Sequence, residues 1–376
     1  MNTALKNFAK EFGVAEDNCY ESIANIPAAK TEQICVVTTP DQIHIDSIRA
    51  AVEKGFKIML LEKPMATTEE DCIEIVQLLE KNSVVAGVFH VLRGSPANVM
   101  IKETIPKLGK ILGARHFEPV GHLHYAHSYV RGNWRRESLS SSFLLAKCCH
   151  DLDIIYWWFG GDAKMDSIES ISSDGFKLYF DKENKPPLAG DARYCKDCPI
   201  SDTCVYSAKK FYTRDNKFSR VACRYGEYDK DIILNGPYGR CVYECDNDVL
   251  DTQQVNIKFK DGPLVDFAVF ATTLSQCSRE TEVFGTLGQI KKLDEYRIEY
   301  TDFESKTTEI LNHDNDEKSP LGGHGGCDGF FLNNFLAALG TGSKPETSPD
   351  VTLVSHQMAF TAEKSRKSGQ KIKINL

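Results

Sequence analysis

The sequence predicts an α/β fold in two parts: a parallel sheet with helices on both faces, then an α+β region with a mixed, largely antiparallel sheet. Its 376 residues exceed what one compact core usually holds. From Gln33 onward, short apolar runs alternate with amphipathic segments, which is typical of strands and helices in a parallel sheet. Residues 165–310 contain several short runs of alternating apolar and polar residues, which is typical of antiparallel strands.

In the first part, the sequence indicates clearly where helices and strands begin and end. The run at Ile34–Thr39 is rich in β-branched residues, as buried parallel strands are. Gly55 supplies a helix stop, and Thr67 with Glu70 forms a capping box that predicts a helix start. The expected strands and helices occupy residues 34–39, 41–55, 57–61, 67–81 and 84–90. Ligands of such sheets lie beyond the carboxyl ends of the strands, so the residues there are the first candidates for a site.

The second part begins after about residue 95. Asp261-Gly262 predicts the turn of a hairpin between two alternating segments. A Gly/Ser/Pro loop at 340–349 separates two helical segments near the end of the chain. The elements expected here are helices at 96–108 and 141–159, a strand at 112–118, a hairpin at 255–270 and helices within 327–366.

The composition excludes several classes of protein. With 41% hydrophobic and 26% charged residues, the chain is ordinary for a globular protein. It has no apolar run near the ~20 residues that a membrane helix requires. A formal net charge of −8 argues against nucleic acid or an anionic membrane as a partner. The first residues lack the layout of a secretory signal, so we expect a cytoplasmic protein with a small-molecule substrate.

Two groups of residues have side chains that could act chemically on a substrate. Lys63, in Glu62-Lys63-Pro64, directly follows an expected strand and would donate a charged hydrogen bond to a substrate hydroxyl or carbonyl. His150 lies on an expected helix with Asp153 three residues later on the same face, an arrangement suited to acid/base chemistry. Taken alone, each has a simpler interpretation: a surface loop lysine, and a structural histidine.

Six stretches together resemble one family, the glucose-fructose oxidoreductase/inositol dehydrogenase (Gfo/Idh/MocA) family of oxidoreductases, over nearly the whole chain. They are TTPDQIH (38–44), LLEKPMATTEED (60–71), VFHVLR (88–93), HYAHSYVRGNWRRE (124–137), LLAKCCHDLDIIYW (144–157) and GHGGCDG (323–329). TTPDQIH and EKP at this spacing are far more specific together than either is alone.

The resemblance implies a truncated Rossmann-type dinucleotide-binding domain at 1–94 and an α/β substrate and oligomerisation domain, with C-terminal helices, at 95–376. It implies NAD or NADP as cofactor, a carbohydrate as substrate, and a homodimer or homotetramer. The catalytic residues implied are Lys63 and His150, assisted by Asp153, and His324 joins Lys63 and His150 as a substrate contact. The cofactor contacts implied are Thr38, Thr39, Pro40, His44, Glu62, Lys63, Pro64, Trp134 and Arg135.

Two departures from the family pattern affect these expectations. Family members begin with a strand, a G-x-G-x-x-G turn, a helix and a second strand, whereas the first residues here resemble the helix after that second strand. We expect an incomplete gene model or fragment, with a degraded paralogue as the alternative. The second departure is Ala146, where many members carry an aspartate four residues before the histidine; Asp153 or Lys147 is the expected substitute.

The cysteines offer a second kind of site. Cys195, Cys198 and Cys204 lie in a loop-like region with a C-x2-C-x5-C spacing, and Cys241 is one candidate for a fourth zinc ligand, beside Cys223 and Cys245. Reduced thiols that pack a loop are the favoured interpretation, and a structural zinc is the alternative. We interpret Cys148 and Cys149, next to His150, as small apolar filler on a buried helix face.

Three functions follow, in order of preference. The first is an NAD(P)-dependent dehydrogenase that transfers a hydride between nicotinamide and a sugar, inositol or related polyol. The second is a catalytically impaired paralogue or fragment that acts as a binding or regulatory protein, which the missing glycine turn and Ala146 favour. The third is an NAD-dependent glycosidase.

Overall fold

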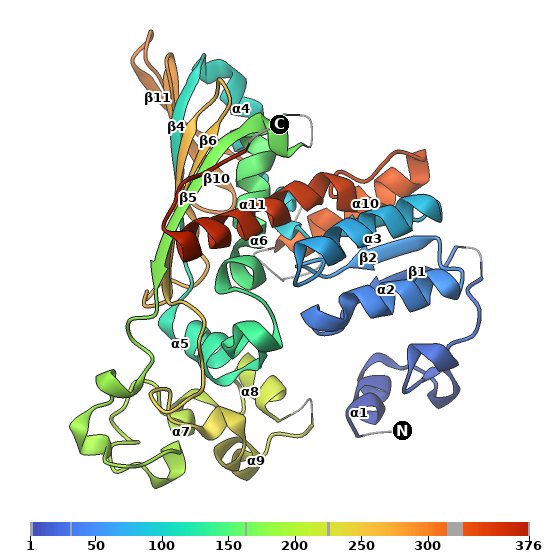
Figure 1. Cartoon of the computed structure of the whole chain (residues 1–376), viewed down its shortest axis with the longest axis vertical. Coiled ribbons are helices and arrows are strands. Elements are labelled where there is room, and N and C mark those ends of the chain that lie inside the picture. The colour runs from blue at the N-terminus through green and yellow to red at the C-terminus, as the bar shows by residue number, and fades with distance from the viewer. Residues whose placement is uncertain (1–2, 31, 162–163, 224–225, 314–325, 375–376) are drawn as a thin grey trace.

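The computed structural model describes residues 3–374 except 31, 162–163, 224–225 and 314–325. It confirms the α/β class, with two separate sheets (Figure 1). The first sheet is parallel throughout and has the order β1-β2-β3. Its strands are β1 (Ile34–Val37), β2 (Ile58–Leu61) and β3 (Val85–Val88).

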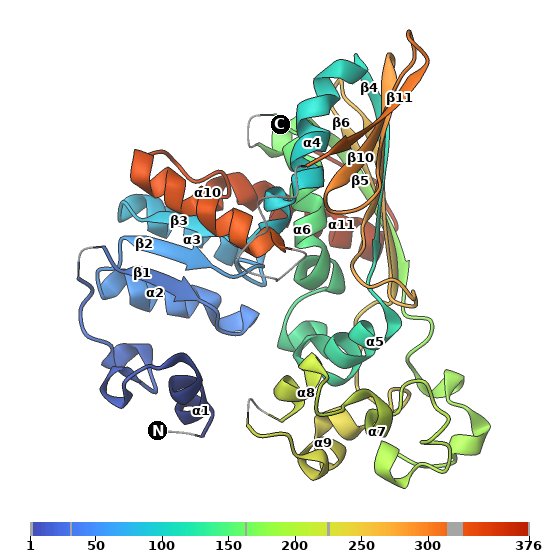
Figure 2. The ribbon, with the colours of Figure 1, turned by 180° about the vertical axis from the view of Figure 1, so that it is seen from behind.

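Helices cover both faces of this sheet because its side chains alternate. Met59 and Leu61 face the core formed with α2 (His44–Glu53) and α3 (Glu69–Lys81), whereas Leu60 packs with Phe331 and Phe335 of α10. Figure 2 shows α10 (Cys327–Thr341) beside these strands. A helix from the end of the chain therefore completes the first layer.

The contact with α10 requires a glycine in β3. A Cβ atom on Gly87 would lie 2.9 Å from the ring of Phe335, closer than real Cβ contacts allow. Gly87 therefore lets the helix approach the sheet.

The second sheet has nine strands in the order β11-β10-β9-β8-β4-β7-β6-β5-β12. The β4–β7 pairing is parallel and the other pairings are antiparallel. The strands are β4 (Ile111–Pro119), β5 (Ile168–Phe176), β6 (Thr252–Phe259), β7 (Leu264–Phe270), β8 (Glu280–Gly285), β9 (Gly288–Lys292), β10 (Arg297–Asp302), β11 (Thr307–Asn312) and β12 (Ile372–Lys373). The predicted hairpin is β6–β7, and Asp261 in its turn has a φ of 52°.

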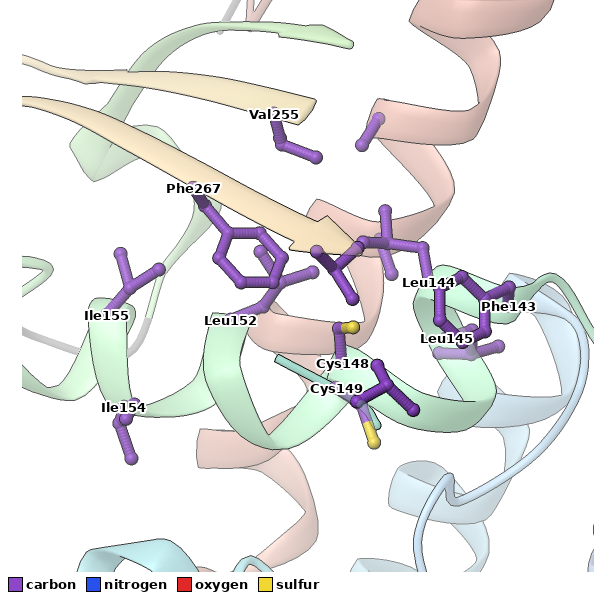
Figure 3. Close-up of a cluster of buried hydrophobic side chains, with 14 of the residues drawn as sticks. Phe143, Leu144, Leu145, Cys148, Cys149, Leu152, Ile154, Ile155, Val255 and Phe267 are labelled. Atoms are coloured by element: carbon purple, nitrogen blue, oxygen red, sulfur yellow. The ribbon is translucent and has the colours of Figure 1, made fainter. Parts of the chain in front are cut away.

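The helix α6 (Phe143–Phe159) is the centre of the second core. Ser142 caps it by accepting a hydrogen bond from the backbone N–H of Leu145 (3.2 Å). Its side chains pack under Val255 and Phe267 of the nine-stranded sheet (Figure 3). Cys148 and Cys149 are fully buried in this core, and burial raises the pKa of the Cys149 thiol to about 12. These surroundings support the interpretation of both cysteines as filler.

The helix α11 (Pro349–Ser368) connects the two parts. It packs against α3 of the first part and against α6 and β5 of the second (Figure 1). The sequence placed both late helices in the second region, whereas in space α10 and one end of α11 belong to the first layer. The remaining helices of four or more residues are α1 (Thr3–Phe12), α4 (Pro96–Thr104), α5 (His122–Tyr125), α7 (Ala208–Phe211), α8 (Lys217–Ala222) and α9 (Lys230–Asn235), with a π-helical turn at Ala126–Arg131 and short 3₁₀ turns at Val91–Gly94 and Ile105–Leu108.

The predicted capping box of α3 is displaced by one residue. Thr68, not Thr67, is the N-cap, and its hydroxyl accepts a hydrogen bond from the backbone N–H of Asp71 (3.1 Å). Two threonines each stand three residues before an acidic residue here, so spacing alone does not separate them.

Within the described ranges, none of the helices is both long and apolar enough to cross a membrane.

Candidate active site between the two parts

His44 joins the loops that follow β1 and β2. Its ring is buried, with Nδ1 2.9 Å from the carbonyl oxygen of Pro64 and Nε2 2.7 Å from that of Thr39. The structure thus brings together three residues that the sequence assigned to a cofactor site. Thr38 and Pro40 lie exposed on the same loop.

Trp134 reaches this loop from the second part. Its indole Nε1–H donates to Asp41 Oδ2 (2.9 Å), and the Ser140 hydroxyl donates to the same oxygen (2.9 Å). Arg135, its neighbour in the predicted pair, instead donates to both carboxylate oxygens of Asp246 (2.8 and 3.3 Å). Trp134 is therefore at the predicted site, and the side chain of Arg135 is held by a different segment.

Lys63 crosses from the first part to α6. Its Nζ donates to the backbone carbonyl of Ala146 (3.0 Å), and its backbone N–H donates to Glu62 Oε2 (3.1 Å). His150 follows Ala146 by one helical turn on the same face of α6. Lys63 thus meets the face of α6 that carries His150.

His150 is buried and lies edge-on to His90, with ring centroids 5.6 Å apart and planes at 86°. Asp153, predicted to assist His150, accepts two hydrogen bonds of 2.7 Å from Arg93, which engage both of its oxygens. Burial would raise the pKa of Asp153, but the Arg93 guanidinium holds it below the usual range. Asp153 thus stays ionised as the partner of Arg93.

Lys147 belongs to a buried row of charges beneath α6. Its Nζ lies 3.0 Å from Glu118 and donates to Cys277 Sγ (3.1 Å). Burial alone would lower the pKa of Lys147, yet Glu118 raises it above its ordinary value. Arg279 links Glu118 to Asp151, each at 2.9 Å, so the charges alternate. Lys147 is therefore engaged in a structural network.

His324, expected at the substrate, lies outside the described residues. The helix after it, α10, has Gly326 as its N-cap with a φ of 98°, and Asp328 lies in its first turn.

Family profiles match both parts of the chain. The profile described as "Oxidoreductase family, NAD-binding Rossmann fold" matches residues 1–90, and "Oxidoreductase family, C-terminal alpha/beta domain" matches residues 102–374. The chain belongs to the Gfo/Idh/MocA family of oxidoreductases.

Individual family relatives are distant in sequence. The "Putative oxidoreductase YteT" of Bacillus subtilis (strain 168) is 26% identical over 323 residues, 81% of this chain and 72% of that protein. The 1,5-anhydro-D-fructose reductase of Ensifer adhaerens is 31% identical over 130 residues, 34% of this chain and 37% of that protein.

Solved structures of oxidoreductases share the fold. A levoglucosan dehydrogenase in complex with NADH and levoglucosan has a TM-score of 0.71 at 15% identity, covering 99% of this chain and 87% of that one. The WlbA dehydrogenase from Bordetella pertussis, in complex with NADH and UDP-GlcNAcA, has a TM-score of 0.66 at 16% identity, covering 99% of this chain and 87% of that one.

The alternative of a structural zinc site at Cys195, Cys198, Cys204 and Cys241 is not supported. Among the residues described, no three His, Cys, Asp or Glu side chains gather as metal ligands, and all thirteen cysteines are free thiols. The buried guanidinium of Arg131 lies 3.6 Å from Cys195 Sγ and donates to the carbonyls of Tyr206 (2.8 Å) and Arg240 (2.7 Å). This cation already holds the segment together, and it would repel a metal ion.

Sequence reasoning missed His90, Arg93 and Asp41 as parts of this region. His90 and Arg93 lie within VFHVLR and Asp41 within TTPDQIH, so the family stretches contained them. Asp153 follows Arg93 by 60 residues and Trp134 follows Asp41 by 93 residues, and spacing cannot reveal partners at such separations.

Proposed function

We propose that this protein is an NAD(P)-dependent dehydrogenase that moves a hydride between nicotinamide and the carbon of a secondary alcohol in a sugar, inositol or related polyol. The observation that carries the proposal is the position of the Lys63 ammonium on α6, one turn before His150. The family and the sugar-directed activities in its relatives' names support the substrate class.

Lys63 and His150 would have two different roles at the substrate oxygen: hydrogen-bond donor and acid/base group. The ammonium of Lys63 would exchange its bond to the Ala146 carbonyl for one to the substrate hydroxyl, which lowers the pKa of that hydroxyl and stabilises the alkoxide. His150 would hold the proton that the hydroxyl loses and return it in the reverse direction. Burial of His150 keeps water away from this transfer.

The residues present fit one end of a dinucleotide. The loops after β1 and β2 are tied together by His44 and covered by Trp134, so Thr38, Pro40 and Glu62 stand at the carboxyl edge of the sheet, where such cofactors bind. When bound, the nicotinamide supplies the hydride acceptor or donor. The 376 residues contain no G-x-G-x-x-G turn, whose amides would hold the diphosphate. Binding must therefore be tested before turnover.

A binding or regulatory paralogue is the second candidate. Ala146 offers Lys63 only a backbone carbonyl, and Arg93 engages both oxygens of Asp153, the expected replacement carboxylate. Such a protein would bind a sugar or the cofactor without turnover.

The first test is fluorescence titration of the purified chain with NADH and NADPH. We expect saturable binding of at least one, weakened about ten-fold by Lys63→Met, because Lys63 is also an expected cofactor contact and its charged hydrogen bond to the nucleotide would be lost. Lys364→Met, which removes an exposed lysine of α11, should bind as the wild type does. A folded sample that responds to neither nucleotide would reject the dehydrogenase.

The second test is turnover with a panel of sugars and inositols, followed through the absorbance of the reduced nicotinamide. His150→Asn should lower kcat about hundred-fold or more, the usual contribution of an acid/base group. Nucleotide binding without turnover on any of these alcohols would favour the paralogue.

Assembly and location complete the proposal. A hollow of about 700 Å³, lined by Arg115, Phe117, Asp266, Phe270 and Glu282, lies on the open face of the nine-stranded sheet and not beside Lys63. We assign this face to a homodimer or homotetramer interface.

The thirteen free thiols support a cytoplasmic location.

A further inference from the structure

We propose that Cys277 is a reactive thiol at which hydroperoxides oxidise this protein to a cysteine sulfenic acid. The Cys277 sulfur lies against the ammonium of Lys147 and the imidazole of His124, on the loop between β7 and β8. This chemistry needs neither nicotinamide nor an alcohol, so it is independent of the proposed dehydrogenase function.

Side chains from two other segments meet at this sulfur. Nζ of Lys147, on α6, donates a hydrogen bond to Cys277 Sγ (3.1 Å), and Nδ1 of His124, on α5, lies 3.7 Å from it. The carbonyl oxygen of Val120 lies 3.9 Å from the same sulfur and accepts from the thiol. Cys277 has a φ of 58°, in the left-handed region that a side chain makes costly, and its backbone N–H donates to the carbonyl of Pro119 (2.5 Å). The loop therefore holds the sulfur between an ammonium and an imidazole.

The ammonium of Lys147 stays protonated beside the sulfur. Burial alone would lower the pKa of Lys147, but Glu118, 3.0 Å from its Nζ, raises it above the ordinary value. Arg279 brings a second cation, since its guanidinium donates to the backbone carbonyl oxygen of Cys277 (3.1 Å). A partly exposed sulfur with cations around it is the setting in which protein thiols react with electrophiles.

The other cysteines lack this combination. Burial raises the pKa of the Cys149 and Cys327 thiols to about 12 and that of Cys241 to about 11, which keeps them protonated at neutral pH. Cys195 also has a guanidinium 3.6 Å from its sulfur, but it is buried. Within the described ranges, Cys277 alone is both partly exposed and hydrogen-bonded at its sulfur by a lysine or arginine.

The hydroperoxide is the single co-reactant that the oxidation needs. The Cys277 sulfur attacks one oxygen of the hydroperoxide, the O–O bond breaks and an S–O bond forms. The sulfur loses two electrons, the hydroperoxide is reduced to an alcohol or to water, and the thiol proton leaves with the departing oxygen. Lys147 can then donate to the new oxygen. Burial, and after it the charge of Lys147, lowers the pKa of His124 to about 3, so its neutral ring can accept from the new hydroxyl.

The first measurement is alkylation of the folded, full-length wild type with iodoacetamide, with the rate at each cysteine followed by peptide mass spectrometry. Cys277 should react about ten-fold faster than Cys198, which is also partly exposed but has no lysine or arginine donor at its sulfur in the described part of the chain. In urea, which unfolds the chain, the two should react at similar rates. This comparison needs no variant.

The second measurement is oxidation with hydrogen peroxide in the presence of dimedone, which adds to sulfenic acids. The adduct should appear first at Cys277. Lys147→Met should slow both adduct formation and alkylation at Cys277 about ten-fold, whereas Lys147→Arg, which keeps a cation, should retain most of the wild-type rate. Lys364→Met, an exposed lysine of α11, is the matched control and should leave both rates unchanged.

The proposal is overturned if Cys277 in the folded chain is alkylated no faster than Cys198, or if dimedone marks another cysteine first. Equal rates in a folded Lys147→Met and the wild type would also overturn it, because the ammonium would then have no part in the reactivity. If Lys147→Met does not fold, the wild-type comparison still decides. Each of these outcomes is separate from failure of the dehydrogenase, which the nucleotide titration measures.

Discussion

Several single side chains around the interdomain region make two polar contacts each. His44 contacts two carbonyl oxygens, Asp153 accepts twice from Arg93, and Asp41 receives Trp134 and Ser140. Apart from the contact between His44 and Thr39, each of these joins segments that are distant in the chain. Removing one partner would therefore leave a buried group without its counterpart.

Asp153→Asn tests this at the buried ion pair. We expect the free energy of unfolding to fall by about 3–5 kcal/mol because Arg93 would keep a buried charge without its anion. Urea denaturation measures the change. Glu304→Gln, an exposed control, should stay within about 0.5 kcal/mol of the wild type. Equal stability of Asp153→Asn and the wild type would show that Arg93 has another anion.

Buried histidines predict the pH dependence of stability. Burial lowers the pKa of His90 and His127 to about 3 and that of His356 to about 4. The unfolded chain takes up these protons below about pH 6.5, so acid favours unfolding. The contribution of these histidines to the free energy of unfolding should be fully present above about pH 6.5. Below that pH the free energy of unfolding should fall by about 1.4 kcal/mol per pH unit for each histidine, down to about pH 4.

Urea denaturation between about pH 7.5 and about pH 5 measures that slope. His356→Gln should flatten it by about one proton, because one group that takes up a proton on unfolding is gone. A slope that His356→Gln leaves unchanged would mean that His356 is already protonated in the folded protein.

The sequence indicated which residues meet at the junction of the two parts better than it indicated their partners. The structure brings Thr39, His44, Lys63, Pro64, Trp134 and His150 to this junction, and their roles there stay predictions. The pairing of Arg135 with Asp246, and of Asp153 with Arg93, depends on the paths of distant loops. The cysteine spacing left zinc open as an alternative because spacing does not show that the Arg131 guanidinium lies 3.6 Å from Cys195 Sγ.

At the scale of helices and strands, periodicity located the elements well but did not show which layer each joins. The strands of the first sheet and α6 lie within one or two residues of their expected bounds. The helix α10 is apolar on most sides, so its sequence could not show that it covers the parallel sheet. Its contacts in space, such as those of Phe335 with Leu60 and Gly87, reveal its layer.

Two alanine substitutions separate this contact from helix propensity. Gly87→Ala should lower the free energy of unfolding by about 1–3 kcal/mol, since its methyl would press on Phe335. Gly340 lies on α10 with open space around it, so Gly340→Ala should instead raise the free energy of unfolding by about 0.5–1 kcal/mol. Thermal denaturation of both variants measures the signs. A stabilised Gly87→Ala would show that α10 stands farther from β3.

At the scale of the whole molecule, the open face of the nine-stranded sheet presents apolar rings beside charges of both signs. Phe117 and Phe270 pack edge to face on it, with centroids 5.3 Å apart. If this face joins two copies, Phe117→Glu with Phe270→Glu should convert the oligomer into a monomer through repulsion between facing carboxylates. Light scattering after size exclusion measures the mass.

Leu188→Glu, which changes a side chain that is 78% exposed, should leave the oligomeric state unchanged. A double variant that keeps the wild-type mass would move the interface to another face.

The path of α11 has a mechanical consequence. One unbroken helix of 20 residues rests at one end on α3 and at the other on β5, with α6 between them. Because such a helix is stiff along its length and packs on both parts of the molecule, it restricts the rotation of one part relative to the other. A substrate of the proposed dehydrogenase would therefore reach Lys63 and His150 through the bending of loops and the rotation of side chains.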